Sequence, residues 1–222
     1  MNSKFSNGFS LTDEIANIIR ERILKGEYGI GEKIKENMIA TELRVSRTPI
    51  REAFKILEDE NLIEYIPNRG CFAKGFTPDD IDDIFALRKA LERIAVERTA
   101  ARIKDEDVVK LVDKHDLMEF HTKKKDVMKV LEIDTEFHEI IYSATGSRFL
   151  AQVLKSYKGY IEKTRKSIRY NQEQLEAMMK EHKALLNAIK KHDPEAAIKA
   201  SDCHVENSKK RAHAVYLDAM KK

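Results

Sequence analysis

One aspartate and three histidines in the C-terminal half of the chain are candidate metal ligands. Asp134 and His138 are four residues apart, so on a helix they lie on one side, a turn apart, at the edge of an apolar face. His182 and His204 belong to two later segments with helical apolar spacing, so the four side chains come from three helices. One carboxylate and three imidazoles suit a divalent ion. The alternative left open by the residues alone is that each histidine is a hydrogen-bonded core residue, because spacing cannot show that three helices converge.

A second set of candidate residues is cationic and belongs to the stretch 45–57. Arg47, Arg51 and Lys55 are four residues apart and lie on one helical face, whereas apolar residues form another. Ser46 is expected to cap this helix, because its hydroxyl can accept a hydrogen bond from a first-turn N–H. One face can pack against a core while the other offers long donors to a DNA major groove. An ordinary solvated charged face is the alternative that periodicity leaves open.

The segments around this helix predict a winged helix-turn-helix. Three helices and then two strands are expected in chain order, at about residues 11–25, 36–43, 46–57, 62–66 and 71–74. Only two residues separate the second helix from the third, which is typical of a helix-turn-helix. The two strands flank a Pro/Asn/Gly turn, and a hairpin in this position is a wing. Arg69 and Gly70 lie at its tip, where an arginine can reach a phosphate or the minor groove.

The composition changes near Gly75. Six of the eight glycines lie at or before it, and Thr77 with Pro78 can then begin a new helix as its N-cap and first residue. We expect a disordered lead-in, a winged helix-turn-helix domain and an all-α domain, at residues 1–9, 10–75 and 76–222. The six helices of the last domain are expected at about residues 78–103, 105–121, 126–144, 147–169, 172–192 and 194–220. The predicted fold class is therefore mainly α, with a small β-hairpin wing.

Charge and composition exclude some classes of protein. The 222 residues contain 36% charged residues and carry a net charge of +3. No apolar segment approaches the length that spans a membrane, so a soluble protein without membrane partners is expected. Cys71 and Cys203 lack paired zinc spacing and are too few for a disulfide framework, which fits a cytoplasmic location. The first 75 residues hold as many acidic as basic residues, so DNA binding must come from the placement of charge.

Two stretches carry a family resemblance. Val45-Ser-Arg-Thr-Pro-Ile-Arg-Glu-Ala resembles the recognition-helix signature of the GntR family of bacterial transcription regulators. Asp79-Asp-Ile…Leu87-Arg-Lys-Ala-Leu-Glu92 resembles the start of the helical ligand-binding domain of its FCD subfamily. The resemblance implies a regulator and not an enzyme, acting as a homodimer on a palindromic operator in double-stranded DNA. It also implies repression that a small organic acid relieves.

The resemblance assigns roles to individual positions. The implied DNA-binding residues are Ser46, Arg47, Thr48, Arg51, Arg69 and Gly70. The implied metal ligands are Asp134, His138, His182 and His204, with zinc as the first candidate ion and nickel, manganese or iron as alternatives. Arg88 matches a pocket arginine that would bind the effector carboxylate, and the alternative for it is a surface salt bridge to Glu92. No catalytic residue is expected.

Some positions depart from the family pattern. Arg44 replaces the usual turn glycine, and Asn37 stands where many relatives carry a basic residue, so the preferred DNA sequence can differ. Ser147 replaces a usual asparagine near the pocket. The remaining histidines are expected at the surface; they are His115, His121, His192 and His213. The rival functions are a metal-dependent hydrolase or lyase-like enzyme with an attached DNA-binding domain, and a metal-free acyl-chain sensor.

Overall fold

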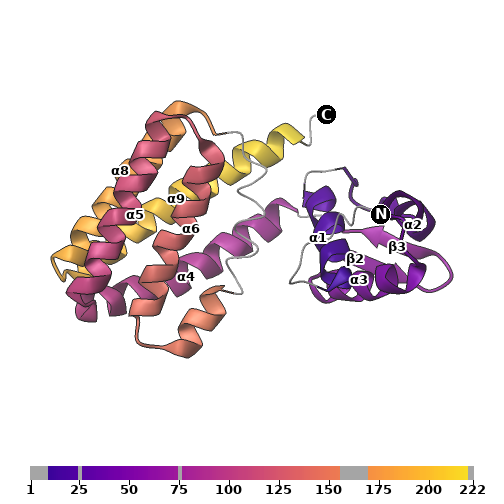
Figure 1. The fold of residues 1–222 in the computed structure, drawn as a ribbon, viewed down its shortest axis with the longest axis horizontal. Helices are drawn as coiled ribbons and strands as arrows, with labels where there is room; N and C mark the ends of the chain where they lie inside the picture. Colours follow the sequence, from indigo (N-terminus) through magenta and orange to yellow (C-terminus); the bar gives the residue numbers. More distant parts are fainter. Residues whose placement is uncertain (1–9, 25–26, 75–76, 156–169, 220–222) are drawn as a thin grey trace. The chain divides into compact units, whose positions relative to one another are not determined.

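The computed structural model describes residues 10–24, 27–74, 77–155 and 170–219 (Figure 1). They form two compact units that divide after Pro78, whereas the sequence predicted a division after residue 75. The first unit combines helices with one small antiparallel sheet, and the second is helical throughout its described residues. This confirms the predicted fold class. The expected lead-in, residues 1–9, lies outside the described part of the chain.

The first unit has a winged helix-turn-helix arrangement. Its elements are α1 (Leu11–Leu24), β1 (Lys33–Ile34), α2 (Glu36–Leu43), α3 (Arg47–Asp59), β2 (Ile63–Ile66) and β3 (Gly70–Ala73). Before α1, the Asp13 N–H donates to Ser10 Oγ at 3.2 Å and the Ser10 N–H donates to the Asp13 carboxylate at 3.3 Å, a reciprocal cap. The antiparallel sheet has the order β1-β3-β2. Strand β1 was not predicted, because a two-residue strand is too short to show alternation.

The third helix is held by its apolar face. Ile50, Ala53 and Leu57 of α3 are fully buried, together with Ile15 and Ile19 of α1. Burial of such side chains stabilises a fold by about 1.5–3 kcal/mol each. This packing fixes which face of α3 stays in solvent, and that face carries the cationic residues.

The turn between α2 and α3 passes through a left-handed residue. Arg44 has φ 56° and ψ 43°, and the N–H of Val45 donates to the carbonyl of Ala40 at 3.1 Å. A non-glycine residue is unusual in this conformation. The Arg44 side chain itself is exposed.

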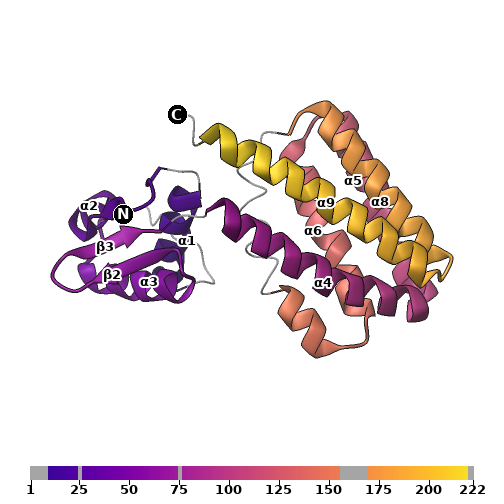
Figure 2. The ribbon, with the colours of Figure 1, turned by 180° about the vertical axis from the view of Figure 1, so that it is seen from behind.

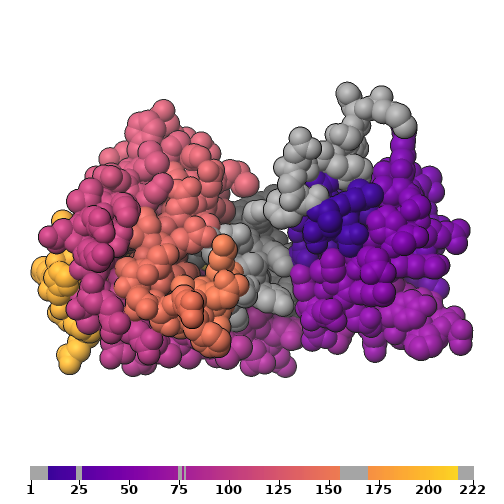
Figure 3. Space-filling model, turned by 60° about the horizontal axis from the view of Figure 1, so that its bottom comes forward, coloured from indigo at the N-terminus to yellow at the C-terminus, as the bar shows by residue number. Residues whose placement is uncertain are grey.

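The second unit is a helical bundle. Its elements are α4 (Pro78–Arg102), α5 (Asp105–Lys123), α6 (Val127–Ala144), a helical segment at 148–155, α8 (Gln172–Lys190) and α9 (Pro194–Ala219). The helix predicted over 147–169 is thus seen at 148–155, and residues 156–169 lie outside the described part. Helices α4 and α9 run beside one another (Figure 2), joined by ion pairs such as Lys89 to Glu206 at 2.8 Å. Helix α5 lies against α6 on the face that Figure 3 presents.

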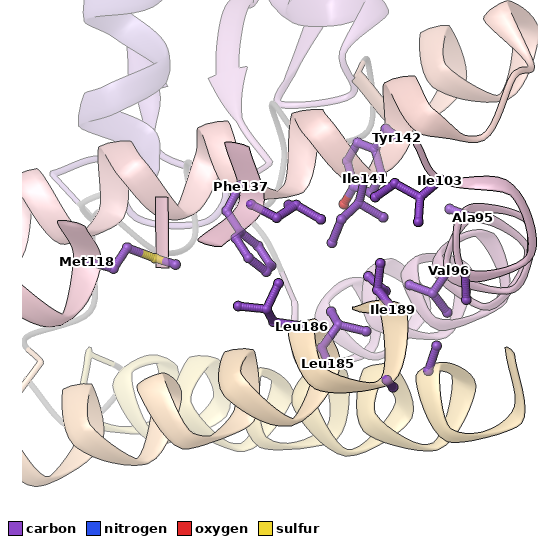
Figure 4. Packing of buried hydrophobic residues seen from close by; sticks show 14 of the residues in the cluster. Ala95, Val96, Ile103, Met118, Phe137, Ile141, Tyr142, Leu185, Leu186 and Ile189 are labelled. Atoms are coloured by element: carbon purple, nitrogen blue, oxygen red, sulfur yellow. The ribbon is translucent and has the colours of Figure 1, made fainter. Parts of the chain in front are cut away.

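Apolar side chains from three helices meet in the interior of the second unit. Val96 of α4, Phe137 and Ile141 of α6, and Leu185 and Ile189 of α8 point toward one another (Figure 4) and are at most 1% exposed. These side chains belong to the same helical rows as the candidate metal ligands. Packing of the core therefore places those ligands in the interior as well.

Within the described residues, no helix combines the length and apolar character that crossing a membrane requires.

Candidate metal centre and DNA-binding surface

The four candidate ligands converge inside the second unit. Asp134 and His138 come from α6, His182 from α8 and His204 from α9, and none is more than 4% exposed. One ligand atom from each lies within 4.8 Å of all the others. Atoms that bind one ion at about 2.1 Å lie at most about 4.2 Å apart, so a small contraction would suffice. The prediction that Asp134 and His138 lie at the edge of the buried face is wrong, because packing of α8 and α9 against α6 covers both.

The hydrogen bonds of His182 leave one ring nitrogen facing the cluster. Its Nδ1 lies 2.8 Å from the Met178 carbonyl oxygen, which can only accept, so Nδ1 carries a proton. In the neutral ring Nε2 then has a lone pair, and it lies 2.8 Å from Asp134 Oδ1 and 3.3 Å from His138 Nε2. Lone pairs and a carboxylate this close repel one another unless a proton or a metal cation lies among them. The donor set therefore fits a divalent ion.

A carboxylate orients His204 from the side away from the cluster. The His204 Nδ1 donates to Glu181 Oε2 at 2.9 Å, which leaves Nε2 as the ligand atom. Glu181 in turn accepts a bidentate pair from Arg211 at 2.9 and 3.0 Å and one bond from Asn207 at 2.9 Å. A carboxylate–histidine pair of this kind fixes the ring and raises its basicity as a ligand.

The Arg88 guanidinium lies beside the cluster and is 1% exposed. Its Nε donates to Glu92 Oε1 at 2.7 Å, and its Nη2 lies 3.3 Å from His204 Nε2. Its Nη1 has no hydrogen-bond partner among the described residues. The alternative salt bridge to Glu92 therefore exists, but it is buried and not on the surface. A buried donor that faces no acceptor costs about 1–3 kcal/mol, which a bound anion could offset.

Burial sets the charge states in this region. Burial lowers the pKa of His138 to about 4, and the nearby Glu92 and Asp134 carboxylates offset this only in part. Burial, with His182 and Arg88 close by, also holds the pKa of His204 well below its ordinary value. Burial is the largest single influence on Glu92 and would raise its pKa, but the charge and hydrogen bond of Arg88, together with His138 and His204, outweigh it and lower that pKa to about 2. At neutral pH both imidazoles can offer lone pairs and Glu92 is ionised.

The other four histidines lie apart from the cluster. His115 is 3% exposed, so its predicted surface position is wrong: the packing of α5 covers it, and its Nε2 lies 3.4 Å from the Met179 carbonyl oxygen. His121 and His213 are partly exposed, and His192 is exposed. A histidine on an amphipathic helix gives no signal of which side a neighbouring helix will cover.

The predicted groove-reading side chains lie at the N-terminal end of α3. Ser46, Arg47 and Thr48 are exposed, and Arg51 has 63% of its side chain in solvent. Ser46 occupies the N-cap position, but its hydroxyl makes no capping hydrogen bond, so that expectation was wrong. Within the described part of the chain the Ser46 hydroxyl is therefore not used in a cap, and it lies at a helix N-terminus, a place where phosphates commonly bind.

Two of the cationic residues on this surface are held by neighbours. Arg51 Nε donates to the two carboxylate oxygens of Glu36 on α2, at 3.0 and 3.1 Å. At the wing tip the Arg69 guanidinium lies over the Phe72 ring, 5.6 Å from its centroid. The next residue, Gly70, has φ +102°, which other residues rarely adopt. These contacts restrict the conformations of the two arginine side chains.

Glu181, Arg211 and Tyr142 were not predicted to have a role in the site. Glu181 precedes His182 on α8, yet its side chain turns toward α9, about 100° away around the helix. Arg211 reaches Glu181 across 30 residues of sequence. No local pattern links such residues, so their role emerges only from the packing of α8 against α9.

Comparison with known proteins gives matches over both units. Residues 11–73 match the family model described as bacterial regulatory proteins, gntR family, and residues 83–207 match the FCD domain model. The gluconate operon transcriptional repressor of Bacillus subtilis (strain 168) is 30% identical over 197 residues, 86% of this chain and 79% of that protein. The structure of Escherichia coli McbR/YncC has a TM-score of 0.68 at 20% identity, covering 95% of this chain and 99% of that one, which shows a likeness of fold. A regulator structure from Rhodococcus sp. RHA1 has a TM-score of 0.67 at 23% identity, with coverage of 93% and 99%.

Proposed function

Because the chain belongs to the GntR family of bacterial transcriptional regulators and carries an FCD domain, we propose that it is a repressor controlled by a small organic acid bound at a metal ion. As a member of this family it is a DNA-binding regulator and not an enzyme. The observation that carries the proposal is the buried cluster with a buried arginine beside it. Its members are Asp134, His138, His182, His204 and Arg88.

A divalent ion in the cluster would be held by one carboxylate oxygen and three imidazole nitrogens. Zinc is the first candidate, with nickel, manganese or iron as alternatives. Four protein ligands leave one or two open coordination positions on a five- or six-coordinate ion, and an effector carboxylate could bind there. Arg88 would then direct its Nη1, which has no partner among the described residues, at the same carboxylate. An acyl chain in this place would leave the charged groups without partners, which disfavours the metal-free acyl-chain sensor.

DNA recognition would use the exposed end of α3 and the wing. Arg47 and Arg51 would read base edges in the major groove, while Ser46 and Thr48 contact phosphates or base edges. Arg69 and Gly70 at the wing tip would approach the backbone or minor groove. A homodimer would place two such surfaces on two half-sites, which requires a palindromic operator.

Effector binding would change DNA affinity only if the acid binds one conformation better than another. We expect the ligand-bound form to hold the operator more weakly, so that the acid relieves repression. Two relatives, from Bacillus licheniformis and Bacillus subtilis, bear the name gluconate operon transcriptional repressor. Gluconate therefore belongs in the first panel of acids.

The first experiment is elemental analysis of the purified protein with thermal melts, with and without chelator and with a panel of small carboxylates. About one metal ion per chain, and a melting temperature that one acid raises, would support the proposal, because a ligand stabilises the form that binds it. Absence of metal, no effect of chelator and no stabilising acid would refute the metal-centred sensor.

Operator binding tests the DNA-binding surface separately. Arg47→Ala or Arg51→Ala should weaken operator binding by about 1–3 kcal/mol, because each removes a base-reading side chain. Arg98→Ala, which removes an exposed arginine from α4, is the matched control and should leave operator affinity unchanged. Operator affinity at the wild-type level in both α3 variants would refute the assignment of the recognition helix.

A further inference from the structure

A second buried carboxylate lies next to the proposed effector position. Glu92 of α4 is 1% exposed and pairs with Arg88 one helical turn before it. Its Oε1 accepts from Arg88 Nε at 2.7 Å and from the Tyr142 hydroxyl at 3.0 Å. Its Oε2 accepts one long bond, at 3.5 Å, from the Ser201 hydroxyl. Three helices thus supply the partners of this carboxylate, and they are distributed unevenly over its two oxygens.

The uneven bonding leaves an acceptor unused. A carboxylate offers about four acceptor sites, and buried polar atoms are normally paired. Among the described residues, Glu92 Oε2 has only the long contact with Ser201, while Arg88 Nη1 has none. Since Arg88 Nε binds Glu92 directly, the open donor and the open acceptor lie on neighbouring side chains. A ligand that carries both a carboxylate and a hydroxyl group would satisfy both.

The charges of the centre restrict the ligand further. Asp134 and Glu92 are two buried carboxylates and Arg88 is one buried guanidinium, which together carry one net negative charge. A divalent ion on the neutral imidazoles would bring this to one net positive charge. One ligand carboxylate balances it. A second ligand carboxylate would be buried without a counterion and close to Glu92, which is costly in a low-dielectric interior.

We propose that the effector is a monocarboxylic hydroxy acid, whose carboxylate binds Arg88 and the metal while a hydroxyl group donates to Glu92. Glu92 is then the specificity-determining residue: it accepts from the hydroxyl group and repels a second carboxylate. This inference rests on the proposed function, because it assumes that an organic acid binds beside the metal.

Two matched sets of ligands test it on the zinc-loaded wild-type protein by titration calorimetry. Lactate is compared with propionate and malate, and gluconate with hexanoate and glucarate. In each set the second compound lacks hydroxyl groups and the third adds a carboxylate. At least one hydroxy acid should bind about tenfold or more tighter than both of its counterparts. Equal or tighter binding of the counterparts, or no binding of either hydroxy acid, overturns the inference. If every other small carboxylate also fails to bind, the proposed function fails with it.

Substitution of the carboxylate tests the role of Glu92 itself. In Glu92→Gln, which keeps the size but removes the charge, the preference for the hydroxy acid over its dicarboxylate counterpart should fall about tenfold. Glu97→Gln on the exposed side of the same helix is the control and should keep the wild-type preference. An unchanged preference in a folded Glu92→Gln protein overturns the assignment. Should this variant not fold, because Arg88 loses its counterion, the wild-type comparison still decides.

Discussion

The carboxylate that orients His204 gives the sharpest test of the metal centre. Glu181 is 8% exposed in its side chain and accepts four bonds of 2.9–3.0 Å, from His204, Asn207 and the two outer nitrogens of Arg211. Glu181→Gln keeps the shape but removes the charge and replaces one acceptor oxygen by an NH2 group. Depending on how the amide is turned, this NH2 group faces either the donors His204 Nδ1 and Arg211 Nη2 or the donors Asn207 Nδ2 and Arg211 Nη1. The substitution therefore perturbs the orientation of a ligand without removing a ligand.

Two effects of known size follow from this geometry. Loss of an outer partner of a ligating histidine lowers metal affinity by about 10–100-fold. Arg211, whose side chain is 9% exposed, also loses its counterion. We expect this to cost the metal-free protein about 2–3 kcal/mol, somewhat less than full removal of a buried partner. For a chain of this size, such a loss lowers the melting temperature by roughly 4–10 °C.

The assay separates these two effects. Zinc affinity is measured by competition with a chromophoric chelator, and stability is measured by thermal melts of the metal-free proteins. Glu176→Gln, at an exposed position of α8, is the matched control and should match wild type in both. A Glu181→Gln protein that melts lower but binds zinc within about threefold of wild type would refute the reasoning, since Glu181 would then only join α8 to α9.

Three further predictions concern individual side chains. His182→Ala should lower the metal content while the far-ultraviolet circular dichroism stays helical, and full metal retention would contradict the site. Gly70→Ala should weaken operator binding and cost about 1 kcal/mol or more of stability, because φ is +102° and the new Cβ would lie 3.1 Å from Lys33 Cε. Operator affinity and unfolding free energy at the wild-type level would contradict this. Burial, and to a smaller extent the nearby Glu58 carboxylate, raises the pKa of Cys71 to about 12. At pH 8 the native protein should therefore react with a maleimide only at the exposed Cys203, and mass spectrometry of the labelled peptides checks this.

Local features in the sequence were sufficient for much of the fold. The helix Glu36–Leu43 was predicted with its observed bounds, and the hairpin strands were predicted within one residue. Helical periodicity, capping residues and turn residues act through contacts a few residues apart, so they can be read along the chain. The resemblance then supplied the family, which the comparisons confirm over both units.

The sequence also selected the four candidate ligands, but it could not show that they meet. Asp134 and His138 share a helix, so their proximity follows from spacing alone. The approach of His182 and His204 depends on how α8 and α9 pack against α6, which is set by the fit of many apolar side chains at once.

Only the tertiary structure decided which polar groups became buried partners. It turned Glu181 toward His204 and away from its neighbour His182, it covered His115, and it set Glu92 between Arg88 and Tyr142. Glu92 and Tyr142, for example, are 50 positions apart in the sequence. A helix exposes several faces at equal intervals, and the sequence of one helix does not state which face its neighbour will cover. The sequence therefore determined the residue types and their spacing along each helix. Packing between helices decided which of these residues share one site.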